Sequence, residues 1–234
     1  TDMRTGIIIL CRFDSIRLPG KILKPIIGKP ILSYILERVA FVDPHLKIIV
    51  ATSNEQSDDP IESYCQENQI SIYRGSKLNV AHRFFSCAEK ANLDFAIRIN
   101  GDNIFTDPII IRKMIEFSLT GHYNFLSNVQ GRTFPPGISV EMVNVQIMKK
   151  NISMFNDYEQ EHVMPFFYKN LPENQILYYK NSEFKYPKGL HLALDTKNDF
   201  IKIESIIQNM IKPHWTYSTK EIIDLYLKLD LVYE

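Results

Sequence analysis

Three cations stand close together directly after the first long apolar run of the chain, GIIIL. They are Arg12, Arg17 and Lys21, in a loop that also holds Gly20, which would let the backbone approach a ligand closely. The apolar run predicts a buried strand, and in an open α/β sheet the loop after the first strand is a usual phosphate site. Arginine binds phosphate oxygens as a fork and lysine as a point charge, so the three suit a triphosphate. By composition alone, a solvated basic loop explains them slightly better, and the Walker phosphate-loop pattern is absent.

Two aspartates are candidates for binding a divalent cation. Asp102, in RINGD, follows a short apolar run, and Asp195, in LALDTKNDF, is predicted to end a strand. Mg²⁺ prefers one or two carboxylates together with phosphate oxygens of a ligand. Each aspartate alone is more often a turn residue or a helix cap, and Thr196 with Asp199 has the spacing of a capping box. Together with the cationic loop, however, they make up a minimal set for metal-assisted attack on a phosphoryl group.

Short β-branched runs alternate with longer helical patterns along most of the chain. This alternation predicts an α/β fold with a Rossmann-like, mostly parallel sheet flanked by helices. The predicted strands are 6–12, 47–52, 70–73, 95–99, 124–127 and 190–194. The predicted helices are one starting at Pro30, with proline at the favoured first position, and 60–67, 80–90, 108–118, 196–210 and 219–229.

The rhythm of strands and helices breaks between residues 129 and 187. Aromatic residues and prolines gather there in FPPG, MPFFY and YPKG. We therefore expect residues 1–234 to form a single domain in which 129–187 is an insertion that covers the site or meets a partner.

Composition narrows the classes of partner and compartment. Lysine plus arginine and aspartate plus glutamate both total 27, and this neutral balance argues against nucleic acid or a membrane as partner. No apolar stretch reaches the roughly 20 residues of a membrane span, and no signal segment opens the sequence. Cys11, Cys65 and Cys87 show neither a pairing pattern nor metal-ligand spacing, so we expect reduced thiols and a cytoplasmic protein.

The cationic loop resembles a family signature. RFDSIRLPGKILKPIIGKPIL is similar to the pattern ARxxSxRLPGKxLxxxxGKPxL of the nucleotide-sugar cytidylyltransferases, which have the nucleotide-diphospho-sugar transferase fold. YRGSKLNVAHR, RINGDNIFTDP, TFPPGISVE, EHVMPF and DTKNDF resemble, in the same order, the motifs of the branch that serves spore coat polysaccharide biosynthesis. The resemblance runs from about residue 6 to residue 200.

The resemblance implies CMP transfer from CTP to a sugar acid or related small-molecule acceptor, with release of pyrophosphate, Mg²⁺ as cofactor and a homodimer whose contact is made by 129–187. It also implies roles for single residues. The residues it assigns to nucleotide binding are Arg12, Ser15, Arg17, Gly20, Lys21, Arg83 and Asn100. It assigns catalysis to Arg12, Lys21 and Asp102. It assigns metal binding to Asp102 and Asp195, and acceptor binding to Glu141 and His162. His162 equally fits a structural or dimer-forming segment.

Four positions depart from the family pattern. Leu10 and Cys11 stand where the family usually has Gln or Pro and Ala, while His82 and Ser139 each replace an aspartate. The last two leave the identity of the acceptor open.

Two other function classes also stay open at this point. One is a glycosyltransferase of similar fold, which would typically carry a DxD motif. The other is a non-catalytic nucleotide-binding protein of polysaccharide assembly.

Overall fold

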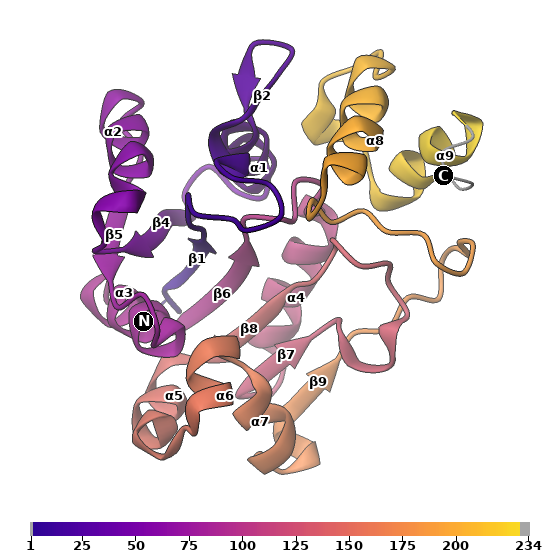
Figure 1. The fold of residues 1–234 in the computed structure, drawn as a ribbon. Helices are drawn as coiled ribbons and strands as arrows, with labels where there is room; N and C mark the ends of the chain where they lie inside the picture. Colours follow the sequence, from indigo (N-terminus) through magenta and orange to yellow (C-terminus); the bar gives the residue numbers. More distant parts are fainter. Residues whose placement is uncertain (1, 230–234) are drawn as a thin grey trace.

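The computed structural model describes residues 2–229 and is built around a seven-stranded sheet (Figure 1). The strand order across this sheet is β5-β4-β1-β6-β8-β7-β9. The strands are β1 (Thr5–Leu10), β4 (Lys47–Ser53), β5 (Ile72–Gly75), β6 (Phe95–Asn100), β7 (Phe125–Ser127), β8 (Glu141–Asn144) and β9 (Ile176–Tyr178). A separate hairpin joins β2 (Pro25–Ile26) to β3 (Lys29–Pro30).

The sheet is mostly parallel, as predicted. β1 lies between β4 and β6 and is parallel to both, and β4 is parallel to β5. β8 is antiparallel to β6 and to β7, while β9 is parallel to β7. The carboxyl ends of β1, β4, β5 and β6 therefore meet at one edge of the sheet, where ligands bind in open α/β folds.

Helices cover both faces of the sheet because side chains of a strand alternate between the faces. Ile7 and Ile9 of β1 pack in one core cluster, with helices α1, α2, α4, α8 and α9, whereas Ile8 and Leu10 pack in another, with α3, α5 and α7. The helices are α1 (Ile31–Ala40), α2 (Asp59–Glu67), α3 (Val80–Lys90), α4 (Pro108–Thr120), α5 (Val145–Asn151), α6 (Asp157–His162), α7 (Pro165–Asn170), α8 (Lys197–Gln208) and α9 (Thr219–Lys228).

The predicted strand at 190–194 is wrong. This segment has no strand partner in the described chain. Its N–H groups make single backbone hydrogen bonds instead, a local one from Leu190 to the Pro187 carbonyl at 3.2 Å and two to distant segments. Leu192 N–H donates to the Pro136 carbonyl at 2.8 Å, and Leu194 N–H donates to the Asp102 carbonyl, also at 2.8 Å. Leu190, Leu192 and Leu194 are all at most 2% exposed, so their strand-like alternation reflects core packing beneath an irregular segment.

The segment 129–187, where the predicted rhythm breaks, holds β8, the three short helices α5, α6 and α7, and β9. In Figure 1 these helices lie together at the lower end of the molecule, next to α3. β8 supplies the antiparallel strand, which the sequence pattern did not predict because Glu141 stands at a buried position within it.

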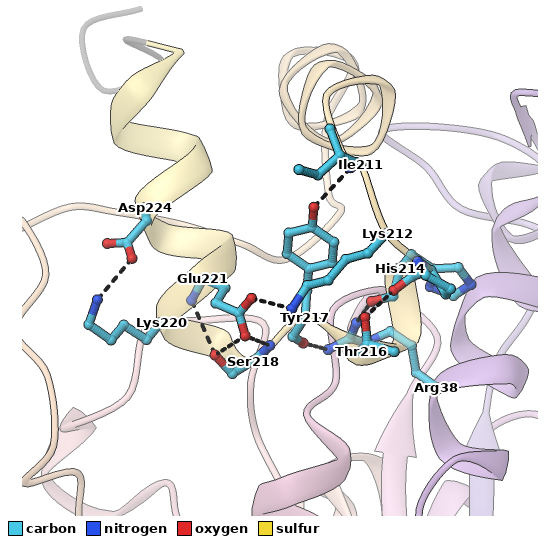
Figure 2. Close-up of polar contacts among 11 residues, drawn as sticks. Arg38, Ile211, Lys212, His214, Thr216, Tyr217, Ser218, Lys220, Glu221 and Asp224 are labelled. Carbon is cyan, nitrogen blue, oxygen red and sulfur yellow. Dashed lines mark hydrogen bonds and ion pairs between the residues drawn. The ribbon is translucent and has the colours of Figure 1, made fainter.

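A buried arginine ties the C-terminal segment to α1. Arg38 is fully buried and donates to the carbonyl of Thr106 at 2.7 Å, to that of Tyr217 at 2.9 Å, and to that of His214 (Figure 2). His214 Nε2 lies 2.7 Å from a carboxylate oxygen of Glu37 on the same helix. Burial lowers the pKa of Arg38 to about 10, and three carbonyl acceptors stand in for the water that it has lost.

The three cysteines are free thiols in the interior. Cys11 is 7% exposed, Cys65 0% and Cys87 1%. Burial raises the pKa of Cys65 to about 11 and that of Cys87 to about 12, and it raises the pKa of Cys11 as well. Thiolates are therefore scarce at neutral pH, which agrees with the prediction of reduced cysteines.

Candidate active site

A cavity of about 610 Å³ opens at the carboxyl ends of β1 and β6. It brings together nine of the eleven predicted site residues. These are Arg12, Ser15, Arg17, Lys21, Arg83, Asn100, Asp102, His162 and Asp195. Gly20 and Glu141 lie outside the lining. Residues that are 183 positions apart in the chain, Arg12 and Asp195, therefore face one space.

The cationic loop after β1 is held in place by Asp58, which the sequence analysis missed. Its carboxylate accepts the Phe13 N–H at 2.7 Å and the N–H and hydroxyl of Ser53. Burial alone would raise the pKa of Asp58, but these donors lower it below the ordinary value. The loop then turns at Gly20, whose φ of 68° places it in the left-handed region and whose N–H donates to the Phe13 carbonyl at 3.0 Å.

Lys21, in the loop after β1, contacts the segment at Leu194 and Asp195, far along the chain. Lys21 Nζ donates to the Leu194 carbonyl at 2.7 Å and lies 3.8 Å from Asp195 Oδ1. Arg17 approaches the same carboxylate oxygen at 3.4 Å. Arg12, at the start of the loop, makes no hydrogen bond or ion pair with any residue in the range 2–229. Two cations, Arg17 and Lys21, therefore lie beside the Asp195 carboxylate, and Arg12 is available to a ligand.

Asp102 carries a buried oxygen that has no hydrogen-bond partner in the described chain. Burial raises the pKa of this carboxyl, Lys21 opposes the shift, and Asp195 adds to it. The preceding residue, Gly101, lies against Cys11 at the end of β1. A Cβ at position 101 would come within 2.8 Å of the Cys11 Cβ, so glycine permits this close packing. An unpartnered carboxylate oxygen beside a second carboxylate fits a hard divalent cation, which takes oxygen ligands.

His191 and Asp199 lie beside Asp195, and ligand atoms of the three are within 4.8 Å of one another. His191 Nε2 is 3.1 Å from Asp195 Oδ2. Asp199 is already engaged, because its Oδ2 accepts from the N–H and hydroxyl of Thr196 and from the Asp195 N–H. The predicted Thr196 and Asp199 capping box is thus confirmed, and Asp195 is the carboxylate of this group that faces the cavity. The sequence analysis did not assign His191 to the site.

Arg83 lines the floor of the cavity from α3. It is 5% exposed, donates to the Ser76 carbonyl at 2.8 Å, and keeps its Nε without a hydrogen-bond partner among the described residues. Burial lowers the pKa of its guanidinium. His82, one of the departures from the family pattern, lies on the same helix but does not line the cavity.

Glu141 is buried behind the wall of the cavity instead of lining it. It is 4% exposed, pairs with the guanidinium of Arg98, and accepts from the Tyr168 hydroxyl at 2.7 Å. Arg98 also donates to the His162 carbonyl at 2.8 Å, at the end of α6. Glu141 is therefore connected to the cavity only through Arg98 and the backbone at His162, and Arg98 is a further residue that the sequence analysis did not assign.

Comparison with known proteins assigns the chain to a protein family. The sequence model of a family described as cytidylyltransferase matches residues 6–222. The chain belongs to the cytidylyltransferase family. The predicted resemblance and enzyme class, CTP-dependent nucleotidyl transfer, are confirmed.

Individual cytidylyltransferases and their relatives agree with this assignment. The chain is 31% identical over 210 residues to the spore coat polysaccharide biosynthesis protein SpsF of Bacillus subtilis (strain 168), covering 86% of this chain and 85% of that protein. A solved structure of a cytidylyltransferase from Leptospira borgpetersenii serovar Hardjo-bovis (strain JB197) superposes with a TM-score of 0.90 and 29% identity, covering 99% of this chain and 97% of the other. The 8-amino-3,8-dideoxy-manno-octulosonate cytidylyltransferase of Shewanella amazonensis is 31% identical over 117 residues, 49% of this chain and 47% of that one.

Proposed function

We propose that this cytidylyltransferase transfers CMP from CTP to a hydroxyl group of an acidic sugar and uses Mg²⁺ at Asp102 and Asp195. The observation that carries the proposal is the meeting of Lys21, Asp102 and Asp195 in one cavity beyond the carboxyl ends of β1 and β6. The acceptor class is supported by two relatives, whose names specify spore coat polysaccharide biosynthesis and an octulosonate.

The reaction is an in-line displacement at the α-phosphorus of CTP. The acceptor oxygen forms a bond to phosphorus, the bond between the α-phosphorus and its bridging oxygen to the β-phosphate breaks, pyrophosphate leaves, and the hydroxyl loses its proton. Arg12 and Lys21 stabilise the negative charge that builds on the leaving pyrophosphate. In phosphoryl transfer a cation that acts in the transition state is worth about 10³–10⁵ in rate.

Asp102 and Asp195 would hold the metal, with the unpartnered oxygen of Asp102 as one ligand. A metal ion held there would supply charge neutralisation at the phosphate and would help to acidify the attacking hydroxyl. Lys21 keeps Asp195 in place through its ion pair and through the Leu194 carbonyl. Asp58 and Gly20 shape the loop that presents Arg12 and Ser15 to the triphosphate.

The test is a comparison of CTP with ATP, GTP and UTP in thermal unfolding, each with and without Mg²⁺. A nucleotide that binds only the native state at 100 times its dissociation constant stabilises the protein by about 2.7 kcal/mol. We expect CTP with Mg²⁺ to raise the melting temperature most. Equal shifts from all four nucleotides would overturn the choice of CTP.

Lys21→Met is the test variant for this experiment, because methionine keeps a long apolar side chain and lacks the ammonium group. The variant should lose most of the CTP-dependent shift. Pyrophosphate release with CTP and a panel of acidic sugars then identifies the acceptor. Failure of every nucleotide to stabilise the wild-type protein would contradict the proposal as a whole.

A further inference from the structure

A second cavity, of about 500 Å³, lies between the segments that follow β7 and β9. Arg132, Phe134 and Pro136 line it from the first segment, and Tyr186, Lys188 and His191 from the second. Its potential cations are Arg132, Lys188 and His191, and no described carboxylate lines it. The active-site cavity is different, because five carboxylates and five cations line that one together. We call this second space the basic cavity.

Two cations of the basic cavity, Arg132 and Lys188, are not neutralised by the described chain, whereas His191 lies beside Asp195. The side chains of Arg132 and Lys188 form no hydrogen bond or ion pair within residues 2–229. In the active-site cavity, by contrast, Arg17 and Lys21 approach Asp195, and Lys77 approaches Asp14 at 3.1 Å. Unpaired cations around an apolar floor suit a ligand that brings its own negative charge.

The walls of the basic cavity are fixed to one another. The Tyr186 hydroxyl donates to the Arg132 carbonyl at 3.1 Å, and the Leu192 N–H donates to the Pro136 carbonyl at 2.8 Å. Gly137 has a φ of 102°, and a Cβ there would lie 2.5 Å from the backbone of Leu192, so only glycine permits this close contact. The basic cavity is therefore a formed site between two segments that brace each other.

Arg132 itself has a left-handed backbone, with a φ of 48°. A residue with a side chain pays a conformational cost in that region, and such strain persists where the surroundings impose it, often at binding sites. Its carbonyl is held by Tyr186, which fixes the backbone from which the guanidinium projects.

The basic cavity adjoins the metal aspartate. His191 lines it, and the Nε2 of this residue lies 3.1 Å from Asp195 Oδ2, while Asp195 lines the active-site cavity. The nucleotide-side loops follow β1 and β5 in one half of the sheet, whereas the basic cavity follows β7 and β9 in the other half. Asp195 thus connects the two spaces, and a donor phosphate in the first would meet an acceptor in the second beside this residue.

We propose that the basic cavity binds the anionic group of the acceptor, so that Arg132 and Lys188 select a sugar bearing a carboxylate or a phosphate. This inference rests on the proposed cytidylyl transfer and places its acceptor. The rings of Phe134 and Tyr186 offer an apolar surface for a sugar face, and the two cations offer charge-assisted hydrogen bonds.

The test uses Arg132→Glu/Lys188→Glu beside Lys150→Glu/Lys228→Glu, a control with the same change in net charge at exposed positions on α5 and α9. Pyrophosphate release from CTP is measured with sugar acids, sugar phosphates and uncharged sugars. We expect turnover with one anionic class only. In the basic-cavity variant the KM for that acceptor should rise about 100-fold, because two charge-assisted hydrogen bonds are lost, while the KM for CTP stays unchanged.

The outcomes separate this inference from the proposed function. Turnover of uncharged sugars alone, or equal KM values in the two variants, would overturn the basic cavity as the acceptor site and leave cytidylyl transfer standing. Loss of CTP stabilisation in the wild type would overturn the function itself. If no sugar in the panel is turned over, saturation-transfer NMR with 3-deoxy-manno-octulosonate and with glucose 1-phosphate, at saturating CTP, decides the matter. Binding that disappears in the basic-cavity variant alone supports the site, and absent or equal binding overturns it.

Discussion

Asp102 holds one of its carboxylate oxygens in the interior without a hydrogen-bond partner in the described chain. An unsatisfied buried polar atom costs about 1–3 kcal/mol, so a fold retains one where something other than stability requires it. The carboxylate of Asp195 lies close enough to raise the pKa of Asp102 further. A cation held by the two carboxylates, as proposed above, would offset both effects.

Asp102→Asn should abolish the Mg²⁺-dependent part of the CTP stabilisation, because a neutral amide is a poor ligand for a hard cation. Without metal, the melting temperature should stay the same or rise, since one of two mutually repelling carboxylates is gone. Asp195→Asn should behave alike in the nucleotide assay. Thermal unfolding with and without Mg²⁺ and CTP measures both effects.

Asp224→Asn is the control for these variants, since Asp224 lies on the surface in an ion pair with Lys220. It should leave the response to Mg²⁺ and CTP unchanged. A metal response that survives in Asp102→Asn would remove this residue from the metal site, and a collapse of its melting temperature would make its role structural.

Glu141→Ala should destabilise the protein by about 3–5 kcal/mol because it leaves the largely buried guanidinium of Arg98 without its partner. Denaturant unfolding measures the loss. Lys220→Ala, which breaks the exposed pair with Asp224, should cost at most about 1 kcal/mol. If Glu141→Ala is as mild as the surface control, the buried pair does not stabilise the wall at His162.

Residue types and family motifs together were enough to predict nine of the residues that line the active-site cavity. The residues that were missed act through contacts that no local pattern encodes. Asp58 binds Phe13 across 45 positions of sequence, and His191 meets Asp195 in an irregular segment that was predicted as a strand. Glu141 was assigned to the acceptor because its motif resembles the family, and only the fold places it behind Arg98.

At the scale of elements, the strands β1, β4, β5, β6 and β7 and the longer helices were predictable, whereas β8, β9 and the short helices α5, α6 and α7 were not. β1 is apolar on both faces, so its sequence reads as a continuous apolar run. The segment at 190–194 has equally buried leucines, but its backbone bonds go to loops. A buried strand and a buried irregular segment therefore have equally apolar sequences. They differ in whether their backbone hydrogen bonds go to a neighbouring strand or to loops.

The contact between α1 and the C-terminal segment should make stability depend on pH. Burial lowers the pKa of His214 to about 4 from its ordinary value of about 6.5. The unfolded chain therefore takes up a proton between these values that the folded protein does not, and unfolding becomes easier as the pH falls from about 6.5 to 4. Denaturant midpoints across this range, read from the fluorescence of Trp215, measure the slope.

His214→Gln is the matched variant for this pH dependence, since its side-chain amide can still donate to Glu37 but cannot titrate. Its stability should fall less steeply between pH 6.5 and 4 than that of the wild type. Parallel slopes for the two proteins would show that other groups govern the acid sensitivity.

At the scale of the whole molecule, we expect a homodimer formed through residues 129–187. Two large apolar side chains of this segment are exposed, Met154 at 60% and Tyr158 at 61%. Light scattering at micromolar concentration should give twice the chain mass, and Met154→Asp/Tyr158→Asp should shift it toward the monomer. Ile211→Asp, at a residue that is 97% exposed outside the segment, should leave the mass unchanged. A wild-type monomer would contradict the expectation.

Compartment and membrane association are also properties of the whole chain. Within residues 2–229, no helix combines the length and apolarity needed to cross a membrane. The expectation of a cytoplasmic protein stays a prediction.

The three interior thiols make the protein a convenient object for site-directed labelling. Because each thiol is at most 7% exposed and has a raised pKa, a maleimide dye should leave the native protein unmodified, while a single cysteine placed at Lys188 should be labelled alone. A fluorophore there would replace one of the two cations proposed to bind the acceptor, so the labelled protein should still bind CTP but should bind the acceptor weakly. Mass spectrometry after brief labelling checks the premise. One adduct on native Lys188→Cys and none on the native wild type are expected, and unfolding in denaturant should raise these numbers to four and three.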